Sequence, residues 1–395
     1  MDIYKESLDL HKKNKGKLGI ISKVPLKDKK DLSLAYTPGV AEPCREIAKD
    51  ISKVYEYTIK QNTVGVVTDG SAVLGLGNIG AEAALPVMEG KCILMKEFAD
   101  IDAFPICIKT QDADEIINIV KNIAPVFGGI NLEDISAPRC FEIERALQGI
   151  GIPVFHDDQH GTAIVILAAL INSLKIVGKK FEDVTVVING AGAAGIAITK
   201  FLKCADIKSD LCSPVKDIIV VDTKGIIYRN REDLSEIKKE ISLFTNKNNI
   251  KGGLADAMKN ADVFIGVSAP NVVTEEMIKS MNKRAIVFAM SNPVPEIMPD
   301  IALRAGAEIV GTGRSDFPNQ INNVLAFPGV FKGALDAKAK VITPEMKYAA
   351  AYALAECVNN PKKDKVLPNP LDKNVPKAIA EAVRLKAIEQ GVIRD

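Results

Sequence analysis

A glycine-rich segment between an apolar run and a helical pattern constrains the fold of this chain more than any other feature. It reads Gly190-Ala-Gly192-Ala-Ala-Gly195, follows the apolar run Val184 to Ile188 and precedes the helical run Ile196 to Leu202. In a strand-turn-helix unit, such glycines permit the tight turn, the approach of a pyrophosphate and close helix packing, in that order. The amides at the helix start then face the anion. We therefore expect a dinucleotide loop that includes Ala193, Ala194 and Ile196, although a tight turn without a ligand is the simpler alternative.

The alternation of strand-like and helical runs extends this expectation to the whole chain. Beyond Gly161, five strand candidates alternate with helical stretches, as parallel strands with helical crossovers require. They are Val184 to Ile188, Ile218 to Val221, Val263 to Val267, Ala285 to Met290 and Glu308 to Gly311. Before residue 160 a separate set of strand candidates comprises Val64 to Thr68, Cys92 to Met95, Pro105 to Ile108 and Ile152 to Phe155. The pattern predicts an α/β protein with an N-terminal α/β domain (1–160) and a C-terminal Rossmann-type, doubly wound parallel sheet with terminal helices (161–395).

A second glycine-rich match, Gly75 to Gly80, has a weaker context. Turn residues, Asp69 to Ser71, stand where the preceding strand should end, and the helix after it soon meets Pro86. We expect this match to be a structural loop.

Composition excludes several classes of protein. Lys and Arg (51) balance Asp and Glu (50), so no global field attracts nucleic acid or anionic lipid. The longest apolar run, Ala163 to Ile171, is about half of the ~18 residues that span a bilayer, and the charged start does not resemble a signal peptide. The seven cysteines form no C-x-x-C pair, which fits a reducing compartment. We expect a soluble cytoplasmic protein that binds neither nucleic acid nor membrane.

The strand after the glycine loop ends in Asp222, which is suited to accept hydrogen bonds from ribose hydroxyls. A carboxylate there favours NAD over NADP because it repels a 2′-phosphate. Lys224, Arg229 and Arg231 weaken this inference, so NADP stays an alternative.

Three carboxylates follow strand candidates. Glu133 and Asp134 come after Ile130 to Leu132, and Asp158 follows Ile152 to Phe155. Ligand clefts of parallel sheets lie at the carboxyl ends of strands, and hard oxygen ligands suit Mg²⁺ or Mn²⁺. The alternative is a helix cap at Asp157 or Asp158 and a solvated loop at Glu133 and Asp134.

His156-Asp-Asp-Gln-His160 also imitates a zinc helix motif, with histidines four residues apart. The histidines of that motif coordinate from within a helix, whereas this stretch directly follows a strand. We therefore prefer the carboxylate site to a zinc hydrolase.

Four other polar residues are candidates for the site. Lys91 is expected at the start of a strand and Tyr36 in a turn, while Asn292 and Asn323 could orient a polar ligand. Solvent exposure and turn formation are the commoner explanations for such residues.

Taken together, the ordered segments resemble the malic enzymes, specifically their short prokaryotic-type form, over essentially the whole chain. The segments are Tyr36-Thr-Pro-Gly-Val, Val67-Thr-Asp-Gly, Leu74-Gly-Leu-Gly, Glu89-Gly-Lys91, Asn131-Leu-Glu-Asp134, His156-Asp-Asp-Gln-His-Gly-Thr162, Gly190-Ala-Gly192, Ser291-Asn-Pro293 and Gly313-Arg-Ser-Asp-Phe-Pro-Asn-Gln-Ile-Asn-Asn323. The resemblance implies oxidative decarboxylation of L-malate to pyruvate and CO₂, with a nicotinamide cofactor and a divalent metal. It also implies a homodimer, or a multiple of one, with the segment near Tyr36 at the interface.

The resemblance further assigns roles. It implies Lys91 as general base, Tyr36 as general acid that protonates C3, and Asp157 as the partner of the lysine. The implied metal ligands are Glu133, Asp134 and Asp158. Thr162, Ser268, Asn292 and Asn323 join the glycine loop and Asp222 as expected cofactor contacts, and both asparagines are expected near substrate.

One position departs from the larger malic enzymes, which carry a substrate-clamping Arg where this chain has Ala72. Carboxylate recognition must therefore fall on other groups. Two rival functions remain at this stage: a 2-oxo acid decarboxylase or malolactic-type enzyme using the same site, and a nucleotide-binding module without chemistry.

Overall fold

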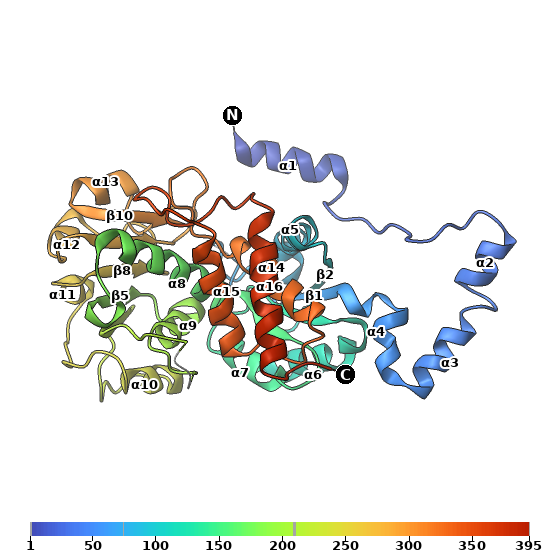
Figure 1. The fold of residues 1–395 in the computed structure, drawn as a ribbon. Coiled ribbons are helices and arrows are strands. Elements are labelled where there is room, and N and C mark those ends of the chain that lie inside the picture. Colours follow the sequence, from blue (N-terminus) through green and yellow to red (C-terminus); the bar gives the residue numbers. More distant parts are fainter. Residues whose placement is uncertain (1, 74, 208–210, 395) are drawn as a thin grey trace.

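The computed structural model describes residues 2–73, 75–207 and 211–394, so Leu74 of the segment Leu74-Gly-Leu-Gly lies outside the described residues. Two parallel sheets flanked by helices form the body of the molecule (Figure 1). This confirms the α/β fold class predicted from the sequence.

The first sheet has four parallel strands in the order β2-β1-β3-β4. The strands are β1 (Thr63–Thr68), β2 (Asp102–Cys107), β3 (Gly129–Leu132) and β4 (Val154–His156). The accompanying helices are α5 (Ala81–Ala99), η3 (Ala124–Val126), α6 (Ala113–Ile123) and α7 (Arg139–Leu147). Because the strands are parallel, the residues that follow β1, β3 and β4 meet at one edge of the sheet.

The second sheet has the order β10-β9-β8-β5-β6-β7, and β7 is antiparallel to its neighbour. Its strands are β5 (Thr185–Asn189), β6 (Asp217–Asp222), β7 (Gly225–Ile226), β8 (Val263–Gly266), β9 (Ala285–Ala289) and β10 (Ala307–Thr312). Its helices are η4 (Phe181–Asp183), α9 (Ala193–Leu202), α10 (Glu236–Ser242), α11 (Leu254–Met258), α12 (Glu275–Lys279) and α13 (Pro299–Arg304). The chain leaves β5 toward β6 and later returns to its other side at β8, so the glycine loop lies at the switch point where ligands bind in such sheets.

A long buried helix, α8 (Asp157–Val177), joins the two sheets. Among the described residues it is the helix long and apolar enough, by length and composition, to cross a membrane, yet most of it is buried in the core. η5 (Asn323–Leu325), α14 (Phe327–Asp336), α15 (Pro344–Glu356) and α16 (Asn374–Glu389) cover the centre of the molecule (Figure 1). α15 begins at Pro344, where the hydroxyl of Thr343 accepts a hydrogen bond from the amide of Met346.

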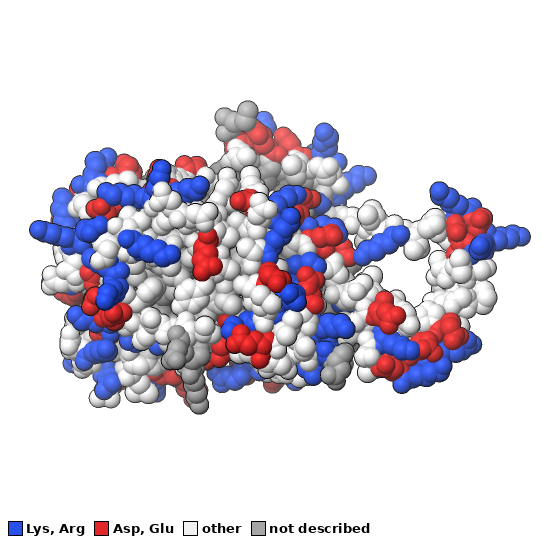
Figure 2. Space-filling view, in the orientation of Figure 1, with Lys and Arg blue, Asp and Glu red and all other residues white. Residues whose placement is uncertain are grey.

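The N-terminal segment projects from the body as an arm (Figures 1 and 2). It contains α1 (Ile3–Asn14), α2 (Lys29–Ala35), α3 (Ala41–Lys49), η1 (Ile51–Lys53) and α4 (Val54–Tyr57), and η2 (Ile59–Asn62) leads from it into β1. None of α1 to α4 buries a residue. Large apolar side chains are instead exposed on the arm, such as Ile20 (85% exposed) and Leu34 (67% exposed).

One predicted strand was wrong. Cys92 to Met95 belongs to α5, which also contains Lys91 and continues through Pro86. The buried side chains of α5 recur every three or four residues, at Ala84, Met88, Cys92, Met95 and Ala99. Burial of this helical face outweighs the hydrogen bond that Pro86 removes.

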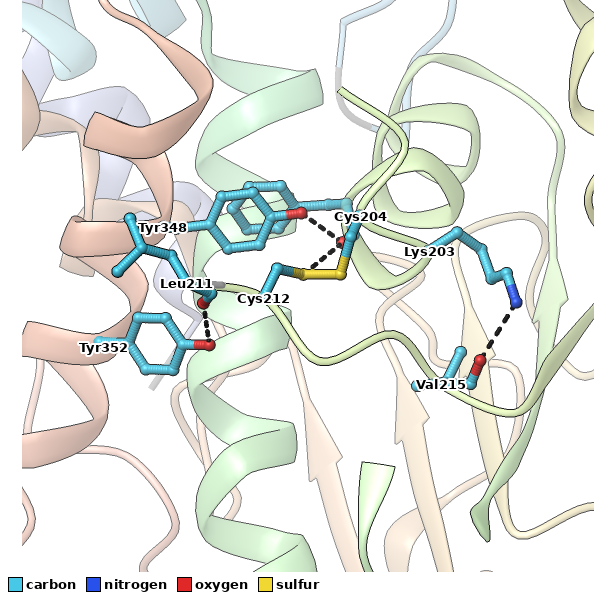
Figure 3. The surroundings of a disulfide bond; sticks show 8 residues. Lys203, Cys204, Leu211, Cys212, Val215, Tyr348 and Tyr352 are labelled. Atoms are coloured by element: carbon cyan, nitrogen blue, oxygen red, sulfur yellow. Dashed lines mark hydrogen bonds between the residues drawn. A yellow bond between two sulfur atoms is a disulfide. The ribbon is translucent and has the colours of Figure 1, made fainter. Parts of the chain in front are cut away.

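Two of the seven cysteines are paired, although the sequence favours a reducing compartment. Cys204, just after α9, forms a disulfide with Cys212 (Figure 3). Tyr348 and Tyr352 of α15 donate hydrogen bonds to the carbonyls of Phe201 and Leu211 beside it. The other five cysteines are free.

Candidate active site

Lys91 lies buried within α5 and forms two ion pairs. Its Nζ is 2.7 Å from Asp157 Oδ2 and 2.9 Å from Glu133 Oε1, and it lies 4.4 Å from the centroid of the Phe327 ring. Burial by itself would lower the pKa of Lys91, but the negative charges of Asp157 and Glu133 outweigh it and raise the pKa. The structure thus brings together the lysine and the acidic residue paired with it in the sequence-based expectation.

Three carboxylates converge beside this lysine. One oxygen from each of Glu133, Asp134 and Asp158 lies within 4.8 Å of the others. Glu133 and Asp134 follow β3, and Asp158 is the second residue of α8, directly after β4. Asp134 has a left-handed backbone (φ 53°), and its amide donates a hydrogen bond of 2.8 Å to Asp158 Oδ2. The predicted carboxylate set therefore occupies one point at the strand ends.

The cluster has the electrostatic character of a cation site. Four carboxylates, including Asp157, face one lysine, and Asp134 Oδ2 is buried without a hydrogen-bond partner among the described residues. Burial and the charge of Asp158 raise the pKa of Asp134 to about 9. Burial likewise raises the pKa of Asp157, although Lys91 opposes this effect. An all-oxygen donor set with excess negative charge fits a hard divalent cation such as Mg²⁺ or Mn²⁺.

Gly161 permits close packing around Asp157. A Cβ at this position would stand 1.9 Å from Asp157 Oδ1 and 3.2 Å from the Cβ of Asn323. Asn323, which begins η5, therefore lies beside the buried carboxylate.

The first glycine-rich match also reaches this region. A Cβ at Gly75 would stand 2.6 Å from the carbonyl oxygen of Asn292, and one at Gly313 would stand 2.5 Å from Asn292 Nδ2. The loop 69–80 therefore separates β1 from α5 and packs against the turn after β9. This geometry agrees with the expected structural loop. Pro86, however, does not end the helix that follows, since α5 continues through it.

The second glycine-rich match has the geometry that a dinucleotide loop needs. Gly190 has a positive φ of 120°, and a Cβ on Gly195 would lie 1.7 Å from the Gly190 carbonyl oxygen. A Cβ on Gly192 would meet no atom within 4 Å, so the space above it is open. Ala193, Ala194 and Ile196 form the first turn of α9.

The remaining expected cofactor contacts lie around this loop or along α8. Ser268 follows β8, and its hydroxyl accepts a 2.7 Å hydrogen bond from Asn189 Nδ2 at the end of β5. Thr162 lies in the second turn of α8. Asp222 ends β6, but its Oδ2 already pairs with Arg231 at 2.6 Å and Lys238 at 2.7 Å. Two cations therefore already pair with the carboxylate that was expected to accept hydrogen bonds from the ribose hydroxyls.

Tyr36 is not part of this cluster within one chain. It ends α2 on the arm, and its side chain is 67% exposed. Its hydroxyl forms no hydrogen bond with any residue that the structure describes.

The two histidines of the zinc-like motif lie in different surroundings. His156 is fully buried at the end of β4, and burial lowers its pKa. His160 Nε2 lies 2.7 Å from Glu144 Oε1. Within the described ranges, neither histidine belongs to the group of side chains that could share a metal ion.

The sequence-based analysis missed two buried acidic residues. The Glu296 carboxylate accepts hydrogen bonds of 3.0 Å from the amides of Ser268 and Ser291, so it ties together the loops after β8 and β9. Asp69 pairs with Arg139 at 3.0 Å and accepts from the Ser71 hydroxyl. Asp69 directly follows β1, and this position at a strand end was a usable signal.

Comparisons with known proteins agree with this geometry. The family model described as malic enzyme, N-terminal domain, matches residues 15–148, and the one described as malic enzyme, NAD binding domain, matches residues 159–388. A relative from Bacillus subtilis, named bifunctional malic/malolactic enzyme, is 56% identical over 398 residues, which cover 100% of this chain and 95% of the relative. The chain belongs to the malic enzyme family.

Other malic enzymes extend the comparison. The NAD-dependent malic enzyme of Geobacillus stearothermophilus is 54% identical, covering 96% of this chain and 78% of the relative. The crystal structure of malic enzyme from Pyrococcus horikoshii superposes with a TM-score of 0.93 at 50% identity, covering 99% of this chain and 92% of that one. The resemblance inferred from the ordered motifs is therefore confirmed.

Proposed function

We propose that this malic enzyme oxidises L-malate to pyruvate and CO₂, reduces a nicotinamide cofactor, and requires a divalent metal held by Glu133, Asp134 and Asp158. The observation that carries the proposal is the ion-paired Lys91, because one of its partners, Glu133, also belongs to the carboxylate cluster. When bound there, Mg²⁺ or Mn²⁺ would supply Lewis-acid polarisation of the hydroxyl and carbonyl oxygens, and the cofactor would accept the hydride.

Lys91 and Asp157 supply the base in this proposal. An amine takes a proton from the malate hydroxyl only when it is neutral. Asp157 and Glu133 raise the pKa of Lys91, so its neutral state requires that a bound cation offset their negative charge. Lys91 would then pass a proton to Asp157, which lies 2.7 Å away and whose pKa burial raises. Asn292 and Asn323, which lie beside the loop 69–80 and Asp157, are proposed to orient the substrate in place of the arginine that Ala72 replaces.

We propose NAD as the preferred cofactor, bound at Gly190 to Gly195 with Thr162, Ser268, Asn292 and Asn323 in contact. Asp222 supports NAD, while its pairing with Arg231 and Lys238 supports the NADP alternative. A relative from Halomonas elongata, 45% identical, is named NADP-dependent malic enzyme. Initial rates of 340 nm absorbance with malate test the proposal, with NAD against NADP and Mn²⁺ against Mg²⁺. Absence of malate-dependent reduction with both cofactors and both metals would overturn it.

A malolactic activity is the second candidate, because the 56% identical relative is named bifunctional malic/malolactic enzyme. It predicts lactate from malate without net reduction of the cofactor. Chromatography of the products separates lactate from pyruvate.

We further propose a homodimer in which the arm of each subunit packs on its partner and places Tyr36 at the partner's site as the general acid. The support is the exposed apolar surface of the arm and the place of Tyr36 at the end of α2, which projects from the body (Figure 1). Mixing Tyr36→Phe and Lys91→Met subunits tests this arrangement. Restored activity in the mixed dimer supports it, since one site then holds both wild-type groups, whereas an inactive mixed dimer contradicts it.

We also propose the division into domains 1–160 and 161–395, and a cytoplasmic location. The separate matches of the two family models support the division. The five free cysteines support the location, whereas the Cys204–Cys212 disulfide does not.

A further inference from the structure

A cavity of about 540 Å³ that is partly open to solvent lies apart from the carboxylate cluster. Residues of α7, the first turn of α8, α9, α10 and the start of α15 line it. Neither Lys91 nor the four carboxylates beside it line this cavity, and Ile196 is the one expected cofactor contact that does. We call it the α7–α15 cavity.

Two cations face the α7–α15 cavity without a partner in the described part of the chain. The Nζ of Lys347 of α15 forms no hydrogen bond or ion pair there, and it lies 6.0 Å from the centroid of the Phe155 ring. Burial lowers the pKa of Lys347. Arg145 of α7 is exposed at the cavity and is likewise unpaired within these residues.

The acidic group nearest to Lys347 is already occupied. Glu144 accepts hydrogen bonds from His160 Nε2 at 2.7 Å, Gln159 Nε2 at 3.1 Å and the His156 amide at 3.3 Å. Another cation of the cavity, Lys200, pairs with Glu240 at 2.6 Å. Asp206 also lines the cavity and its negative charge acts on Lys347, so Lys347 and Arg145 together leave an excess of one positive charge, which an anion would neutralise.

The cavity also has apolar walls beside these cations. Phe141, Phe201, Ile237 and Tyr348 line the cavity, and the Phe201 and Tyr348 rings stack with centroids 4.0 Å apart. A fully hydrated inorganic ion would leave these walls unused, whereas an apolar body would cover them.

We propose that the α7–α15 cavity binds a small organic anion, with a carboxylate or phosphate head on Lys347 and Arg145 and an apolar body against Phe141 and Ile237. This site is independent of the proposed malate activity, because its binding is measured without turnover.

Calorimetric titration of the full-length protein with phenyl phosphate, benzoate and neutral benzyl alcohol tests the proposal. Saturating NAD keeps the probes from the glycine loop. We expect binding of at least one anionic probe and none of the alcohol, and the stronger anion identifies the head group. Lys347→Met, which keeps the length of the side chain, should weaken binding by at least ~10-fold, as loss of a charged hydrogen bond does. Lys377→Met, on the exposed face of α16, is the matched control and should bind like the wild type.

Ile237→Ser tests the apolar half. It should weaken binding of the aromatic anion but not that of inorganic phosphate. Absence of anion binding in the wild type, or undiminished binding in Lys347→Met with an unchanged thermal midpoint, would refute the proposal. If Lys347→Met does not fold, Arg145→Met provides the same comparison at the exposed rim.

Discussion

Replacing Lys91 by methionine separates the chemical role of the buried ammonium group from its role in stability. The variant keeps the length of the side chain but removes the charge that lies 2.7 Å from Asp157 and 2.9 Å from Glu133. Loss of a general base lowers turnover by about 10²- to 10⁴-fold, so we expect malate oxidation to fall by at least ~100-fold.

The same change leaves two buried carboxylates without their cation. Breaking a buried ion pair on one side costs roughly 3–5 kcal/mol. With a typical unfolding entropy per residue, this corresponds to a fall of about 4–6 °C in the thermal midpoint of the metal-free protein. Mn²⁺ should recover much of the loss, because a cation in the cluster compensates the same carboxylates.

The assay combines 340 nm absorbance in malate, NAD and Mn²⁺ with thermal unfolding in a chelator. Lys96→Met is the control, since Lys96 lies on the same helix but pairs with Asp100 and Asp102 at the surface. Exposed pairs contribute about 0–1 kcal/mol, so this variant should keep activity and stability. Near-normal turnover of Lys91→Met would refute the assignment of the base, and an unchanged midpoint would refute the ion-pair argument.

Three further predictions concern the metal, the pH and the cofactor. Asp134→Asn should raise the Mn²⁺ concentration for half-maximal activity by at least ~10-fold, and an unchanged titration would remove Asp134 from the ligand set. Burial raises the pKa of Asp134 to about 9, above its unfolded value, so its contribution to stability is present at low pH and is lost as the pH rises through about 9. The thermal midpoint of the metal-free protein should therefore decrease as the pH rises from ~6 to ~9, and Mn²⁺ should reduce this dependence on pH. A pH dependence of the midpoint that Mn²⁺ does not change would count against the cluster. Gly192→Ala should leave the thermal midpoint within about 1 °C, since the added Cβ meets no atom within 4 Å. The same variant should weaken NADH binding by at least ~10-fold in a fluorescence titration, because the Cβ would occupy the space of the pyrophosphate. Wild-type affinity would argue against a pyrophosphate at this loop.

The second sheet was largely predictable because its strands are continuous apolar runs bounded by polar turns. β5, β6, β8, β9 and β10 all lie within a residue or two of the predicted runs. The position of the glycine loop was predictable as well, since the strand, the turn and the helix follow one another without interruption.

The errors arose where local signals competed with tertiary packing. The short apolar run Cys92 to Met95 is typical of a strand, and Pro86 is typical of a helix end. The buried side chains of this segment nevertheless recur with the 3.6-residue period of a helix, and their burial stabilises α5. The proximity of Lys91 to Asp157 could not follow from local pattern, because these residues are 66 positions apart and meet only when α5 and α8 pack together. The Cys204–Cys212 disulfide was missed because its spacing matches no redox motif.

The orientation of α8 has a consequence for how negative charge accumulates at the strand ends. Its first two residues are Asp157 and Asp158, and its 21 residues run away from the cluster into the core. The aligned peptide dipoles of a long helix give its N-terminus about half a positive charge. Because the core fixes this partial charge in place, it stays with the carboxylates whether or not a cation is bound and whichever group holds the proton. The helix end therefore offsets part of the repulsion among the four carboxylates in every protonation state of the cluster.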